Sequence, residues 1–103
     1  IMIETARALA TRMAREADDK APEQIAFAFA SVLTRLPSPA ELDVLRGHHE
    51  QLLSQYSKDV NAAKALISIG ERTVPHDIDP TKLAVLTGVA RVILSLHETL
   101  TRY

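Results

Sequence analysis

The sequence has no cysteine and no tryptophan, and only two Phe and two Tyr among its 103 residues. Without cysteine, the chain can form neither a disulfide nor a thiolate metal site, and it cannot attach haem covalently through its own residues. With so few aromatic rings, a hydrophobic core must be built from Leu, Ile, Val, Ala and Met. These absences restrict the chemistry of the chain but do not indicate its redox compartment.

The sequence also has no large excess of basic or acidic residues. It contains 12 basic and 13 acidic residues, so the net charge is −1. A nucleic-acid-binding domain needs a basic face, so we expect no nucleic-acid partner. No apolar run approaches the roughly 20 residues of a membrane span. A hydrophobic fraction of 47% is ordinary for one folded domain of this length. Because the chain starts at Ile1 without an initiator Met, we expect residues 1–103 to be a single domain from a longer protein, and the missing signal peptide then indicates nothing about its compartment.

Apolar residues recur at intervals of three and four along the chain, and strand-like alternation is absent. The pattern predicts an all-α fold, a compact bundle of about five helices near residues 2–18, 22–36, 39–57, 60–70 and 80–101. The clearest start signal is SPAE at residues 38–41, where Ser38 can cap the helix and Glu41 can complete a capping box. In the first helix, we expect Arg7, Arg12 and Arg15 to face solvent.

The helix expected at residues 80–101 is the most apolar of the five, and Asp79 and Pro80 mark its start. Its apolar residues cover an arc of roughly 200°, about twice the stripe of a surface helix. We therefore expect this C-terminal helix to be the buried centre of the bundle, with Leu86 and Ile93 near the middle of the arc. The buried arc is expected to extend to Leu96 and His97. The opposite face is expected to hold Ala84, Thr87, Gly88, Arg91, Ser95, Glu98 and Thr99.

On that opposite face, Arg91, Ser95 and Glu98 form a polar ridge beside Gly88. Two interpretations of the ridge are open. It can be an interaction surface for other domains of the parent protein, or it can be a solvated face of the helix with no partner.

Histidines are the side chains that suggest metal or acid–base chemistry. His48 and His49 are adjacent, so they diverge by about 100° on a helix, and neither has a second ligand three or four residues away. His49 and His97 lie in apolar stripes, which favours hydrogen-bonded core histidines, and a long-range pair between them is an alternative if their helices pack. His76 lies in a loop at residues 71–78, interpreted as a connector. We predict no catalytic residue, no metal ligand and no cofactor, and we keep His49, His76 and His97 as polar candidates.

The end of the chain, ARVILSLHETLTR at residues 90–102, resembles the closing signature ARxLLNLDExxTR of a planctomycete-type family. Two upstream segments agree in order: ETARALA at residues 4–10 is similar to the family's EAARALA, and RLPSPAEL at residues 35–42 is similar to its GRxPTxxEL turn. The family is planctomycete-specific domain one, also called domain of unknown function fifteen fifty-three. The resemblance covers the C-terminal part of its longer domain. Ser95 and His97 stand where the family usually has Asn and Asp.

The resemblance implies a C-terminal module of a large exported protein, preceded by a c-type cytochrome-like domain and another uncharacterised domain. Any haem would belong to that cytochrome-like domain, since this chain lacks Cys-x-x-Cys-His. We therefore expect a non-catalytic structural and protein–protein interaction module, in the periplasm or at the cell surface, whose partners are other domains of the same protein. Two alternatives stay open: part of a composite enzyme active site completed by other domains, and a free-standing binding module or homodimer.

Overall fold

The computed structural model describes residues 2–69 and 77–101, with side chains for residues 3–69 and 77–97. Within these ranges the chain forms five helices and no strand: α1 (Met2–Glu16), α2 (Ala21–Leu33), α3 (Pro39–Lys58), α4 (Val60–Ile67) and α5 (Pro80–Thr101). The predicted all-α bundle is confirmed. Among the described residues, no helix combines the length and the apolar character needed to cross a membrane.

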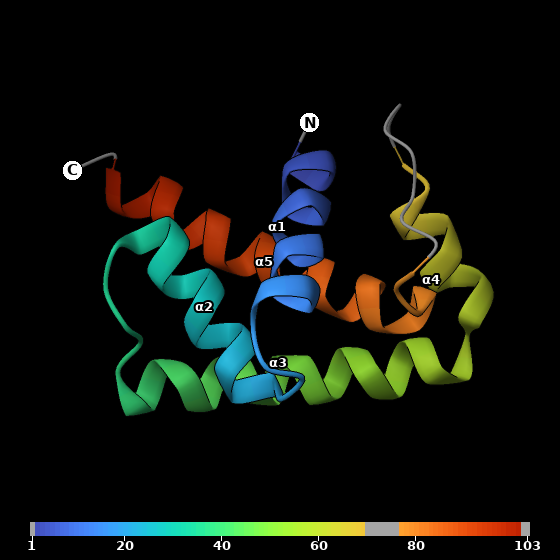
Figure 1. Cartoon of the computed structure of the whole chain (residues 1–103), viewed down its shortest axis with the longest axis horizontal. Coiled ribbons are helices and arrows are strands. Elements are labelled where there is room, and N and C mark those ends of the chain that lie inside the picture. Colours follow the sequence, from blue (N-terminus) through green and yellow to red (C-terminus); the bar gives the residue numbers. More distant parts are fainter. Residues whose placement is uncertain (1, 70–76, 102–103) are drawn as a thin grey trace.

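The helix α5 is the centre of the arrangement, because it contacts each of the other four helices. Figure 1 shows α1 lying across the middle of α5, while α3 runs along one edge of the bundle. The other extensive contacts join helices that are neighbours in the chain, α1 with α2, α2 with α3, and α3 with α4. The bundle is therefore assembled around α5, as the sequence predicts.

Helix starts follow the predicted capping signals. At α3, the Ser38 hydroxyl accepts a hydrogen bond from the Glu41 amide (3.2 Å), and the Glu41 carboxylate accepts one from the Ser38 amide (2.8 Å), which completes the capping box. Asp59 and Asp79 cap α4 and α5, since each carboxylate accepts a hydrogen bond from the amide three residues later, at 3.0 and 3.1 Å. These caps place the helix starts within one residue of the prediction.

Helix ends differ more from the prediction. The helix α2 ends at Leu33, three residues early, because Thr34 adopts a left-handed backbone (φ 59°, ψ 23°). The Thr34 amide donates to the Ala30 carbonyl at 3.0 Å, which satisfies one of the last helix acceptors. As a result, Leu36 lies outside the helix and is 70% exposed.

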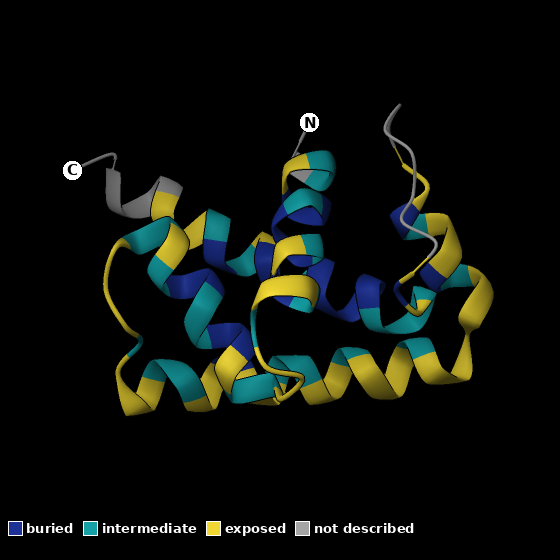
Figure 2. Cartoon of the chain, in the orientation of Figure 1, coloured by how far each residue is buried: buried dark blue, intermediate teal, exposed yellow. Residues whose placement is uncertain are grey.

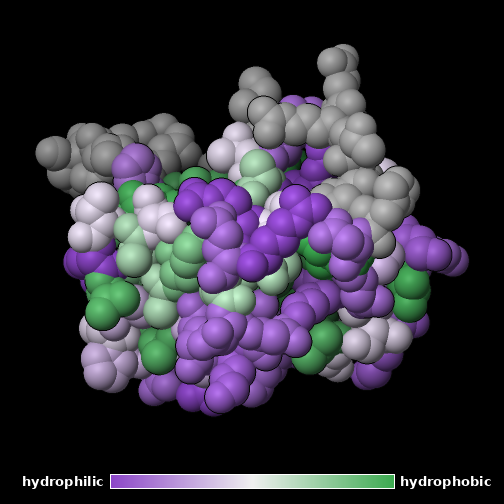
Figure 3. Space-filling view, in the orientation of Figure 1, coloured by the Kyte–Doolittle hydropathy of each residue, from purple (hydrophilic) through white to green (hydrophobic). Residues whose placement is uncertain are grey.

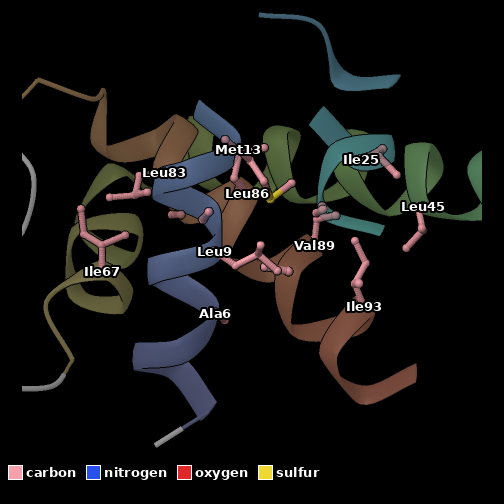
Figure 4. Close-up of a cluster of buried hydrophobic side chains, with 14 of the residues drawn as sticks. Ala6, Leu9, Met13, Ile25, Leu45, Ile67, Leu83, Leu86, Val89 and Ile93 are labelled. Atoms are coloured by element: carbon pink, nitrogen blue, oxygen red, sulfur yellow. The ribbon is translucent and has the colours of Figure 1, made fainter. Parts of the chain in front are cut away.

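Aliphatic side chains build the core, as the composition predicts. Figure 4 shows Leu9 and Met13 of α1 facing the row of apolar side chains on α5. Leu86 and Ile93 are both fully buried, so the predicted centre of the buried arc is confirmed. One aromatic side chain, Phe29 of α2, is also fully buried.

The expected division of α5 into a buried and an open face is wrong in part. Ala84 and Thr87 are fully buried, whereas Leu96 and His97 are exposed. Figure 2 shows burial over the first half of α5 and increasing exposure toward its end. A helical projection treats every turn alike, but the neighbouring helices enclose α5 most fully at residues 83–90, and beyond Ile93 its described side chains are partly or fully exposed. Thr87 is accommodated there because its hydroxyl donates to the Leu83 carbonyl at 2.7 Å.

Arg7 also differs from the prediction that it faces solvent, because the residue is buried (3% exposed). Its guanidinium donates hydrogen bonds to the carbonyls of Ile67 and Ile69, the latter at 3.1 Å. These carbonyls lie at the C-terminal end of α4, where unpaired acceptors and the helix dipole both favour a cation. Arg12 and Arg15 are exposed, as predicted.

Candidate functional site

A hollow of about 440 Å³ opens between α3, α4 and the second half of α5. The lining residues on α3 are four positions apart, and those on α5 are one, three or four apart, so each set lies on one side of its helix. The lining consists of His48, Leu52 and Tyr56 from α3, Leu66 from α4, and Gly88, Arg91, Val92, Ser95 and Leu96 from α5.

A second hollow, of about 300 Å³, adjoins the first and shares Val92 and Leu96 with it. Its other lining residues, Ala40, Glu41, Val44 and Leu45, come from the first half of α3. We call the combined surface the α3–α5 groove. Along α3 it extends from Ala40 to Tyr56, which corresponds to about 24 Å of helix axis.

The α3–α5 groove leaves apolar side chains in contact with solvent. Val44 is 72% exposed and Leu96 is 38% exposed, and Leu52, Tyr56 and Val92 are only partly buried. On the face drawn in Figure 3, hydrophobic residues lie at both sides, over the α2–α3 connection and near α4, whereas the centre of that face is hydrophilic. Exposed apolar side chains that lie together in a hollow offer a surface that a partner can cover.

Among the described lining residues of the groove, the charge that is not ion-paired is positive. Arg91 is exposed and forms no ion pair within the part of the chain that the structure describes. Glu41, the acidic residue of the lining, is held by two hydrogen bonds from Arg35, at 2.8 and 2.9 Å. The bonds from Arg35, followed by the bond from the Ser38 amide, lower the pKa of Glu41 to about 2. The described lining therefore offers an unpaired cation but no unpaired acid.

Two of the three residues of the predicted polar ridge lie in one wall of this groove. Arg91 and Ser95 are both exposed and both line it, while the side chain of Glu98 lies outside the described residues. The opposite wall includes His48 and Leu52, which the sequence reasoning did not connect with the ridge. The sequence carries part of this signal, because Leu52 and Tyr56 follow His48 at intervals of four residues, but periodicity does not say which other helix such a row of residues faces.

The histidine candidates are not brought together. His49 is half-buried in a separate hollow of about 250 Å³, beside Thr81 and Val85 near the start of α5, and burial lowers its pKa. His97 is exposed and follows Val85 by about 18 Å of helix axis. His76 lies outside the described residues. The structure thus does not form the alternative His49–His97 pair.

Gln24 is a buried polar residue that the sequence reasoning missed. It borders the hollow that contains His49, its side chain is 2% exposed, and its Nε2 atom has no hydrogen-bond partner within the described part of the chain. The available signal was its place in the sequence, directly before Ile25 and four residues before Ala28, both of which are fully buried.

No three His, Cys, Asp or Glu side chains are grouped to hold a metal ion within residues 3–69 and 77–97. The α3–α5 groove is the candidate site on grounds of its shape, its exposed apolar side chains and its charge. Comparison with known protein families, with curated proteins and with solved structures finds no match to this chain.

Proposed function

We propose that this chain is a non-catalytic helical module that docks onto other domains of a larger protein through its α3–α5 groove. One observation carries the proposal: the exposed apolar side chains of Val44 and Leu96 share a groove with Arg91, which has no ion pair within the described residues. Covering this surface would remove apolar area from water, at about 25 cal/mol per Å² before the costs of association.

The partner domains that we propose rest on the resemblance to planctomycete-specific domain one. The resemblance favours partners that lie upstream in an exported, cytochrome-associated protein. Such a protein would be located in the periplasm or at the cell surface. This part of the proposal is tested by the gene upstream of Ile1. We expect a signal peptide and a Cys-x-x-Cys-His motif there, and a start codon near Met2 would contradict the proposal.

Docking is tested by producing the upstream domains as a separate chain and measuring their binding to residues 1–103 by isothermal titration calorimetry. We expect a complex, and we expect Leu96→Asp to weaken it at least about tenfold, because the new carboxylate must be desolvated at the interface. Leu53→Asp is the matched control, since Leu53 is 43% exposed but lies outside the α3–α5 groove. Absence of binding, or equal weakening by both variants, would contradict docking through this groove.

A further inference from the structure

We infer that the segment received by the α3–α5 groove is an amphipathic α-helix that carries acidic side chains along one edge of its apolar stripe. The inference rests on the proposed docking function and adds the chemistry of the partner. Three properties of the groove support it: the kind of backbone that forms its walls, its length, and the sign of its charge.

The backbone of the walls favours a helical partner over an extended one. Both long walls are α-helices, whose backbone N–H and C=O groups are already hydrogen-bonded within the helix. An extended peptide would find no free sheet edge here, and its own backbone groups would lose water over apolar side chains such as Leu52 and Val92. A helix satisfies its backbone internally, so it can cover the same surface without that loss.

The length of the groove fits a helix of ordinary size. The segment of α3 that lines it, from Ala40 to Tyr56, measures about 24 Å, which a partner helix matches with about 16 residues. Such a helix presents apolar anchors at positions i, i+3 or i+4, and i+7 on one face. The apolar side chains that would receive them include Val44 and Leu96, which are exposed, and Tyr56, which is partly buried.

The positive charge of Arg91 favours acidic residues along one edge of the partner helix. Arg91 stands exposed on the α5 wall, and Glu41 on the α3 wall is already neutralised by Arg35. A carboxylate opposite Arg91 gains an ion pair, whereas a Lys or Arg there meets like charge. Pairs at the rim of an interface contribute more to orientation and selectivity than to affinity.

The same charge argues against a second copy of this chain as the occupant. In a symmetric dimer, each groove would meet the same surface of its partner. Arg91 would then approach a groove that contains another Arg91 and no unpaired acid among its described lining residues. A partner with the opposite charge is therefore favoured over self-association.

The experiment uses two designed helical peptides of about 16 residues, with the same Leu stripe and with either Glu or Lys along one edge. Their affinities for residues 1–103 are measured by fluorescence anisotropy at low salt. We expect the Glu peptide to bind at least about tenfold more tightly than the Lys peptide. We expect Arg91→Glu to reverse this preference, and Leu96→Asp, but not Leu53→Asp, to abolish binding of both peptides.

Several outcomes would overturn the inference: no binding of the Glu peptide, equal affinity of the two peptides, or an unchanged preference in Arg91→Glu. Thermal melting first establishes that each variant is folded, and Arg91→Glu alters an exposed position. If the upstream domains bind through Leu96 while the Glu peptide does not, the partner chemistry is wrong and the docking function stands. If neither the upstream domains nor the peptide binds, both proposals fail.

Discussion

Gly88 of α5 and Leu52 of α3 are so close that a side chain at position 88 would overlap that of Leu52. A Cβ atom built on Gly88 would lie 2.5 Å from Leu52 Cδ1. The missing side chain therefore allows Leu52 to pack directly over the backbone of α5 in the α3–α5 groove. The glycine was expected on an open polar face, where no such contact would arise.

The first prediction concerns Gly88→Ala. Leu52 Cδ1 is the end of a flexible, partly buried side chain, so we expect Leu52 to move into the groove rather than the helices to separate. The free energy of unfolding should change by less than about 1 kcal/mol, because the higher helix propensity of Ala offsets the cost of moving Leu52. Binding of the upstream domains should weaken. Urea unfolding and titration calorimetry measure the two effects.

Gly47→Ala is the matched control for that variant. A Cβ atom on Gly47 meets nothing within 4 Å, so only helix propensity changes. We expect the free energy of unfolding to rise by about 0.5–1 kcal/mol, and the binding of the upstream domains to stay unchanged. Unchanged binding in Gly88→Ala would mean that Leu52 does not narrow the groove.

The elements of the fold could be predicted from sequence because their signals are local. Ser38, Asp59 and Asp79 cap helices through atoms a few residues away, and periodicity alone identifies the stripes that contain Leu86 and Ile93. The groove could be predicted only in part. Arg91 and Ser95 were found as a ridge, but the wall opposite them belongs to another helix, and which helices face each other depends on tertiary packing.

Buried Arg7 illustrates the same limit and leads to the second prediction. Its guanidinium bonds the carbonyls at the end of α4, so Arg7→Met would leave those acceptors without their charged donor. We expect the free energy of unfolding to fall by about 1.5–3 kcal/mol. Arg12→Met is the control, since Arg12 is exposed and pairs with Glu16 at the surface, and it should lose less than about 1 kcal/mol. Similar losses in both variants would show that the Arg7 bonds add no stability of their own.

Ile93 supplies the third prediction. Its side chain is fully buried at the centre of the α5 core, so Ile93→Ala should lower the free energy of unfolding by about 2–5 kcal/mol. Arg91, two residues earlier, is exposed, and Arg91→Ala should change stability by less than about 0.5 kcal/mol. Thermal melting of both variants checks the orientation of α5. Equal small shifts would mean that the buried side of this helix has been assigned wrongly.

Glu41 gives a prediction about pH. Its pKa is lowered from 4.5 to about 2, first by the hydrogen bonds from Arg35 and then by the Ser38 amide. Because the folded state holds Glu41 ionised more strongly than the unfolded state does, this stabilisation is fully present above the unfolded pKa and is lost as the pH falls toward 2. Between about pH 5 and pH 2, the wild type should therefore lose more stability than Glu41→Gln. A carboxyl titration followed by NMR measures the pKa directly, and a value near 4.5 would contradict the prediction.

The helix α5 touches every other helix of the bundle, yet it follows all four of them in the chain. During synthesis, α1 to α4 leave the ribosome before the helix against which they pack, and their extensive contacts with one another are limited to chain neighbours. Their apolar faces stay uncovered until α5 emerges, so aggregation and chaperones compete with folding throughout that interval. Completion of the core is thereby tied to the end of translation of this segment, and a chain released before α5 should be a target for proteolysis rather than a smaller folded domain.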